Sequence, residues 1–251
     1  MKKPALNSIR EDFDARIMSA VELFAKVADD AKGNWNNING WEGHYPGHAR
    51  RIVGLAFMQM LIAWEELVEA TLMRYIAGAS APSGYSPNLL LGHAKSISHA
   101  YQLISGKPKY DASKHFMSWD TWSTLLDTVG LYIKDAAPFS NLSALQKQRL
   151  HDAKVIRNRV AHFSKKVRED FVVVAKSHIG LSPDKKLSKG YDVGQLLIDE
   201  SSKGFGSVKK EPYFIHYANL ILACADVICP PNEEPIEPPQ PTTISSVNSR
   251  G

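Results

Sequence analysis

The chain has 251 residues, 44% of them hydrophobic, and a formal net charge of only +4 at pH 7. These values predict one domain with extensions and a real hydrophobic core. No uncharged apolar run reaches the length of a membrane span, and the start of the sequence does not read as a signal peptide. The composition therefore excludes a membrane-spanning class and favours a cytoplasmic protein.

Residues 1–33 are predicted to hold an amphipathic helix that packs on a helical bundle. Ser8 and Glu11 form a capping-box pattern, in which the side chain of each residue accepts a hydrogen bond from the backbone N–H of the other. Apolar residues then recur at helical spacing until Gly33 ends the pattern; they are Phe13, Ile17, Ala20, Phe24 and Ala31.

The next stretch, residues 33–47, is predicted to be a loop. His44 lies within it and His48 directly after it, and the two have the spacing of a zinc-binding pair on a helix. Pro46 and Gly47 argue against a helix there, and no Cys or third nearby His completes a site. We therefore expect loop histidines and no bound metal.

Three helices are expected between residues 49 and 138. The first, over 49–77, is apolar on most sides from Ile52 to Ala63 and should be buried at the centre of the bundle. The second covers 89–105. The third begins at a capping Ser118 and ends before Pro138.

A long helix is predicted to start at the capping box of Ser143 and Gln146 and to run to about Arg168. Its apolar residues Ile156, Val160, Phe163 and Val167 follow helical spacing and predict one stripe packed in the core. On such a helix Asn158 and His162 share the face turned away from the stripe, with Arg157 on its flank and the small Ala161 beside it.

The chain after Asp170 is predicted to form a small β-hairpin or an irregular insertion over 171–210. Two β-prone runs, at 171–176 and 191–198, flank a stretch with turn chemistry. A last helix is predicted with Pro212 at its first position. It carries Cys224 and Cys229, for which we expect core packing in a reducing compartment. Residues 230–251 are Pro-rich and predicted to be disordered. The expected fold class is thus mainly all-α.

The Arg157-Asn158-x-x-Ala161-His162 element resembles the signature of the HEPN superfamily of helical domains. The earlier segment 60–69, an apolar run followed by Ala-Trp-Glu, is similar to the helix that opens HEPN domains of the RiboL-PSP type. The resemblance covers about residues 48–170 and implies a HEPN-like helical domain over 48–229. Ser164 stands where many HEPN toxins have a Tyr, so regulation through such a Tyr is not implied.

The resemblance implies a metal-independent endoribonuclease without a cofactor, which uses the RNA 2′-OH as nucleophile and leaves a 2′,3′-cyclic phosphate. His162 would transfer protons, Arg157 would stabilise the phosphate charge, and Asn158 would orient His162 or a phosphate oxygen. Glu65, if it faces the motif helix, would hold Arg157 through a bidentate ion pair. The alternative is a non-catalytic HEPN module for binding RNA or nucleotides or for protein assembly.

The charge distribution and the resemblance also predict partners. Residues 147–189 contain 12 Lys or Arg against 4 Asp or Glu, which either attract an RNA backbone or form a solvated helix face. The expected RNA contacts are Lys154, Arg159, Lys165 and Lys166. Since one His supplies one proton-transfer group, we expect a homodimer that joins two motifs. A toxin-like or phage-defence effector with an antitoxin or defence-system partner fits the resemblance.

Overall fold

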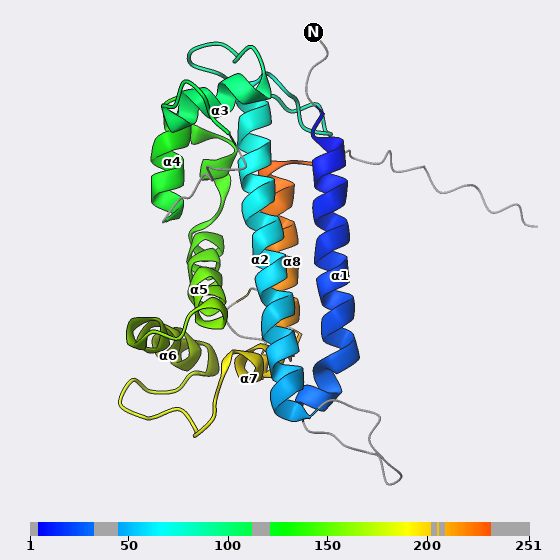
Figure 1. Cartoon of the computed structure of the whole chain (residues 1–251), viewed down its shortest axis with the longest axis vertical. Coiled ribbons are helices and arrows are strands. Elements are labelled where there is room, and N and C mark those ends of the chain that lie inside the picture. The colour runs from blue at the N-terminus through cyan, green and yellow to red at the C-terminus, as the bar shows by residue number, and fades with distance from the viewer. Residues whose placement is uncertain (1–4, 33–44, 112–120, 202–204, 206–208, 232–251) are drawn as a thin grey trace, which may run out of the picture.

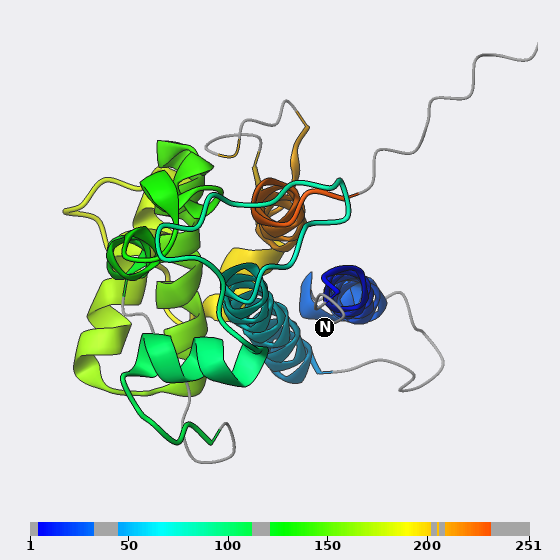
Figure 2. The same ribbon diagram turned by 90° about the horizontal axis from the view of Figure 1, so that it is seen from above.

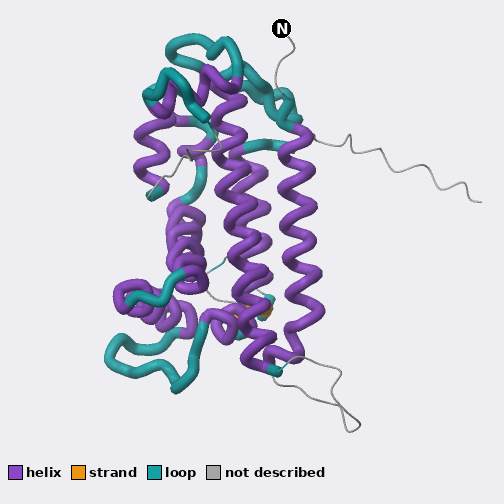
Figure 3. The backbone as a smooth tube through the Cα atoms, viewed as in Figure 1, coloured by secondary structure: helices purple, strands orange, loops and turns teal. Residues whose placement is uncertain are grey.

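The structure, a computed structural model, describes residues 5–32, 45–111, 121–201, 205 and 209–231. These residues are mainly α-helical, as predicted, with one small antiparallel pair of strands (Figures 1 and 3). Three long helices lie side by side, and Figure 2 shows them nearly end-on. They are α1 (Asn7–Lys32), α2 (Pro46–Ile76) and α8 (Tyr213–Ile228).

The remaining helices pack around this trio. They are α3 (Ile97–Ser105), α4 (Trp122–Gly130), α5 (Ala144–Ala161), α6 (Lys165–Ile179) and α7 (Val193–Ile198), with short 3-10 helices at Lys134–Ala136 and Phe139–Asn141. Helix α5 lies against α2 on the side away from α1 (Figures 1 and 2). Helices α3 and α4 lie at one end of the bundle, and α6 and α7 at the other (Figure 1).

Aromatic side chains interlock the three long helices. Phe24 of α1 stacks on Phe214 of α8 with ring centroids 4.4 Å apart, and Phe57 of α2 meets Phe214 edge-on at 6.3 Å. All three rings are buried. Such pairs add about 0.5–1.5 kcal/mol to the stabilisation that burial alone provides. The predicted apolar stripe of α1 is confirmed, since Phe13, Ile17, Ala20, Phe24 and Ala31 are all buried.

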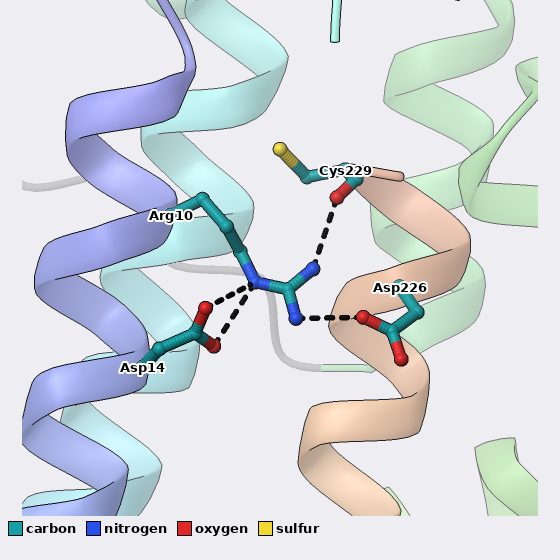
Figure 4. A network of polar contacts seen from close by, with 4 residues as sticks. All are labelled: Arg10, Asp14, Asp226 and Cys229. Carbon is teal, nitrogen blue, oxygen red and sulfur yellow. Dashed lines mark hydrogen bonds and ion pairs between the residues drawn. The ribbon is translucent and has the colours of Figure 1, made fainter. Parts of the chain in front are cut away.

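A buried arginine joins the start of α1 to the end of α8 (Figure 4). Nε of Arg10 donates to both carboxylate oxygens of Asp14 at 3.0 Å, and Nη2 donates to Asp226 at 2.6 Å. Nη1 donates to the backbone carbonyl of Cys229 at 3.0 Å. The guanidinium thus satisfies a carbonyl at the helix end, which has no partner within the helix.

The predicted last helix is present, but it begins one residue later than expected. Pro212 is its N-cap residue and not its first helical residue, and Cys224 and Cys229 are both buried and free. Burial raises the pKa of the Cys224 thiol to about 12 and that of Cys229 to about 11. Both thiols are therefore protonated at neutral pH and serve as packing groups.

The two predicted strands at 171–176 and 191–198 are wrong, although a small hairpin is present nearby. Residues 171–176 lie within α6 and residues 193–198 form α7, while β1 (Glu200–Ser201) pairs antiparallel with β2 (Glu211–Pro212). The buried residues of α6 are Phe171, Val174, Ala175 and His178, which recur at helical spacing. This helical period overrides the β-propensity of the Val-rich run.

Several predicted helix ends also need correction. The helix expected over 89–105 begins only at Ile97, because the side chain of Ser96 accepts a hydrogen bond from the His99 N–H and caps it. Helix α4 ends at Gly130 and not just before Pro138. Helix α1 begins at Asn7, so the expected cap Ser8 lies inside the helix.

Some predictions concern residues at the edges of the described ranges or outside them. Helix α2 already begins at Pro46, so His48 is helical and the loop prediction for it is wrong. Proline is tolerated there because the first N–H of a helix has no internal partner. His44 and the expected cap Ser118 lie outside the described residues, as do residues 232–251 of the predicted tail.

Candidate functional site

The long motif helix predicted from Ser143 to Arg168 is wrong at its far end. Its start is confirmed: the Ser143 N–H donates to Gln146 Oε1 at 2.8 Å, and the Gln146 N–H donates back to Ser143 Oγ at 3.2 Å. Helix α5 then ends at Ala161, and His162 is extended, with φ −135° and ψ 145°. Ser164 accepts from the Val167 N–H and begins α6 as its N-cap. A cap competes with helix continuation at this residue.

This break changes which motif residues are buried. Ile156 is fully buried, and Val160 is half-buried where it approaches Gly54 of α2. Phe163, predicted to be in the core, is 83% exposed, and Val167 is only half-buried. The predicted stripe is therefore wrong beyond Val160, because a three-residue break between helices resets the rotation of the side chains.

Arg157 is held beside the central helix by two side chains. Nη2 donates to Oε2 of Glu65 on α2 at 3.5 Å, and Nη1 donates to Oδ1 of Asn158 at 3.3 Å. The predicted contact with Glu65 is thus present, through one carboxylate oxygen and without the expected bidentate geometry. The Arg157 side chain is 28% exposed, and its buried Nε has no hydrogen-bond partner among the described residues. The guanidinium is therefore anchored but keeps unused donors.

A second group forms where α5 ends. His162 is exposed, and its N–H donates to the Asn158 carbonyl at 2.9 Å. Nη1 of Arg159 donates to the His162 carbonyl at 3.1 Å, and the same guanidinium lies 5.3 Å from the centre of the Phe163 ring. The backbone at His162 is thereby fixed from both sides while its imidazole faces solvent.

The structure brings the predicted residues together only in part. Arg157, Asn158 and Glu65 form one contact group, and Arg159 contacts His162. Within the described part of the chain, no hydrogen bond joins the Arg157 guanidinium to the His162 imidazole. The other candidate cations are Lys154, half-buried on α5, and Lys165 and Lys166, both highly exposed at the start of α6.

A buried polar cluster between α5, α6 and α8 escaped the sequence analysis. Arg149 of α5 pairs with buried Asp152 at 2.8 Å, and the Arg149 guanidinium lies 5.0 Å from the Phe205 ring. Nε2 of His178 on α6 lies 2.8 Å from the Tyr217 hydroxyl of α8. Asp152 precedes buried Ile156 by one helical turn, so a carboxylate on the core stripe was a signal for this cluster.

His178 is the neutral member of this cluster. Its burial, followed by the charge of Arg149, lowers the pKa of His178 from its ordinary value of 6.5. Nδ1 lies 2.9 Å from the Val174 carbonyl, which can only accept, so Nδ1 carries the proton. Nε2 then accepts from Tyr217, whose pKa burial raises well above 10. Protonation of the imidazole would leave the Tyr217 O–H without this acceptor.

Neither a metal cluster nor a membrane helix is found in the described ranges. No group of three or more His, Cys, Asp or Glu residues in them is arranged to hold a metal ion. No helix in them is long and apolar enough to cross a membrane. Comparisons with protein-family models, curated proteins and solved structures found no match to this chain.

Proposed function

We propose that the chain is a metal-independent endoribonuclease of the HEPN type, with Arg157, Asn158 and His162 at its active site. One observation carries the proposal. A guanidinium braced against the central helix by Glu65 lies just before a helix end that presents an exposed imidazole. Anchored cations and accessible histidines are the groups that RNA transesterification requires.

The proposed reaction moves one proton from the RNA and returns one to it. The 2′-oxygen gives up its proton to a base and attacks the adjacent phosphorus, and the P–O5′ bond breaks. The 5′-oxygen takes a proton, leaving a 2′,3′-cyclic phosphate and a 5′-hydroxyl. Charge builds up on the nonbridging oxygens, where the Arg157 fork of N–H donors stabilises it.

His162 supplies one of the two proton-transfer groups, and we assign the second to the same residue of another copy. A two-fold homodimer that opposes the two α5 ends would supply both groups. Asn158 has two roles in this arrangement. Its side chain contacts Arg157, and its carbonyl accepts from the His162 N–H. It therefore links the phosphate-binding group to the proton-transfer group.

The test is cleavage of a labelled single-stranded RNA in the presence of EDTA. We expect wild-type cleavage with cyclic phosphate ends, and loss of cleavage in His162→Ala and in Arg157→Ala. His151→Ala, an exposed histidine of the same α5, and Arg168→Ala, an exposed arginine of α6, are matched controls that should cleave normally. Unfolding curves check that each variant is folded.

Two results would overturn this proposal. One is cleavage of a strand with 2′-deoxyribose at the scissile position, since that strand lacks the nucleophile. The other is EDTA-sensitive activity that persists in His162→Ala. RNA binding without cleavage by the wild-type protein would instead favour a non-catalytic binding module.

A further inference from the structure

Phe163 is the most exposed of the large apolar side chains that the structure describes. Its exposed fraction is 83%, against 79% for Leu91, the next highest. The ring follows His162 directly and lies in the break between α5 and α6. A phenylalanine left in water forgoes the stabilisation that burial would give it. The folding of this chain therefore does not account for an aromatic ring at this position.

The surroundings of Phe163 are positively charged. The Arg159 guanidinium lies 5.3 Å from the ring centre and is held there by its hydrogen bond to the His162 carbonyl. Lys165 and Lys166 follow at the start of α6, and both side chains are more than four-fifths exposed. Their ion pairs, to Glu169 at 3.8 Å and to Asp170 at 3.2 Å, are solvent-exposed and weak. Both ammonium groups can therefore turn to an anionic ligand.

We infer that Phe163 is a stacking platform for an unpaired base of single-stranded RNA, at the nucleotide next to the phosphate on which His162 acts. The inference rests on the proposed ribonuclease function and names its substrate class. An exposed aromatic ring beside cations is the combination that binds single strands, in which bases stack on rings and cations track the backbone. In the proposed homodimer the two cationic α5 ends would repel each other if they touched directly, so we expect an anionic strand, and not the second copy itself, to cover this surface.

The position of Phe163 sets which RNA fits. Phe163 follows His162 directly, so we place the base on this ring in a nucleotide adjacent to the phosphate at His162. Bases inside a duplex stack on each other and cannot reach a protein ring. The site therefore selects unpaired segments, and it does so without hydrogen bonds that read the base sequence.

Binding of a short single-stranded RNA with 2′-O-methyl riboses tests this inference without cleavage. Fluorescence anisotropy gives its affinity for wild type and for three variants. We expect Phe163→Ala and Phe163→Leu to weaken binding about 5- to 150-fold, since a leucine has no π-face, and Phe163→Trp to bind as wild type. The affinity for the same RNA in duplex form should differ little between wild type and the Phe163 variants. Leu91→Ala, a change of an equally exposed apolar residue, is the control.

Three outcomes would overturn the inference. They are unchanged RNA affinity in Phe163→Ala, wild-type affinity in Phe163→Leu, and no RNA binding by the wild-type protein. If Phe163→Ala keeps its RNA affinity but loses a dimer, the ring serves assembly instead. The proposed function is read separately, from cleavage of an unmodified strand by wild type and His162→Ala. Normal cleavage with Phe163-independent binding removes only the stacking role. Phe163-dependent binding without cleavage supports stacking and removes only the proposed catalysis.

Discussion

Acidification should destabilise the folded protein through one residue, His178. The folded state holds this imidazole neutral, with Nδ1 donating to Val174 and Nε2 accepting from Tyr217. Around it lie the Arg149–Asp152 pair of α5 and Tyr213 of α8, whose ring is 5.1 Å away. The unfolded chain takes up a proton on this imidazole more readily, because burial and the Arg149 charge lower its pKa in the folded state.

The sign and the upper limit of the effect follow from that shift. The stability that neutral His178 confers is fully present above its ordinary pKa of 6.5 and is lost as the pH falls below it toward the folded-state pKa. One proton changes the free energy of unfolding by at most about 1.4 kcal/mol per pH unit. Between pH 7.5 and 5.5 this residue should therefore remove up to about 1.4 kcal/mol.

Urea unfolding at both pH values measures this change, and His178→Gln isolates it. Glutamine keeps a donor and an acceptor but does not titrate in this range. We expect a smaller loss of stability on acidification in His178→Gln than in wild type. His151→Gln, which replaces an exposed histidine, should keep the wild-type loss. Equal losses in wild type and His178→Gln would refute the reasoning.

Three further predictions concern stability and positioning. Arg10→Ala should lower the free energy of unfolding in urea by about 2–3 kcal/mol, mainly because the buried Cys229 carbonyl loses its donor. The carboxylates of Asp14 and Asp226 are about half exposed, so the loss of their ion pairs adds little. Ile156→Ala should lower the free energy of unfolding by about 2–5 kcal/mol, because Ile156 is buried, and Phe163→Ala by less than about 0.5 kcal/mol, because Phe163 is exposed. Equal losses would contradict the break after α5. Glu65→Gln should slow the proposed RNA cleavage while the free energy of unfolding changes by less than about 1 kcal/mol. An unchanged cleavage rate would mean that the contact with Glu65 does not position Arg157.

Residue patterns predicted the fold well where one helix face meets the core. The apolar stripe of α1, the buried centre of α2 and the capping box at Ser143 are all present. Each depends on contacts between residues three or four apart, which a sequence displays directly. The Val-rich run of α6 misled because β-propensity reflects packing as much as backbone preference.

The candidate site was predicted less completely, because it depends on where a helix stops. Apolar spacing continues through Phe163 and Val167, so periodicity alone reads one helix where there are two. The Ser164 side chain caps α6 and so separates it from α5. Such a cap competes locally with a continuous helix, and apolar spacing does not reveal it. The contact between Glu65 and Arg157 was predicted from the family resemblance and from charge, but its single-oxygen geometry depends on how α2 and α5 pack.

The break after α5 gives the two halves of the proposed site different properties. Arg157 lies before the break, where Glu65 and Asn158 hold it against the helix pair. His162 lies in the break, where only its backbone is held and its imidazole is exposed. An uninterrupted helix would have turned Phe163 into the core, whereas the break leaves it exposed beside His162. A site that anchors a cation but exposes both an aromatic ring and an imidazole would suit a flexible, unpaired strand better than a rigid duplex, as the proposed function requires.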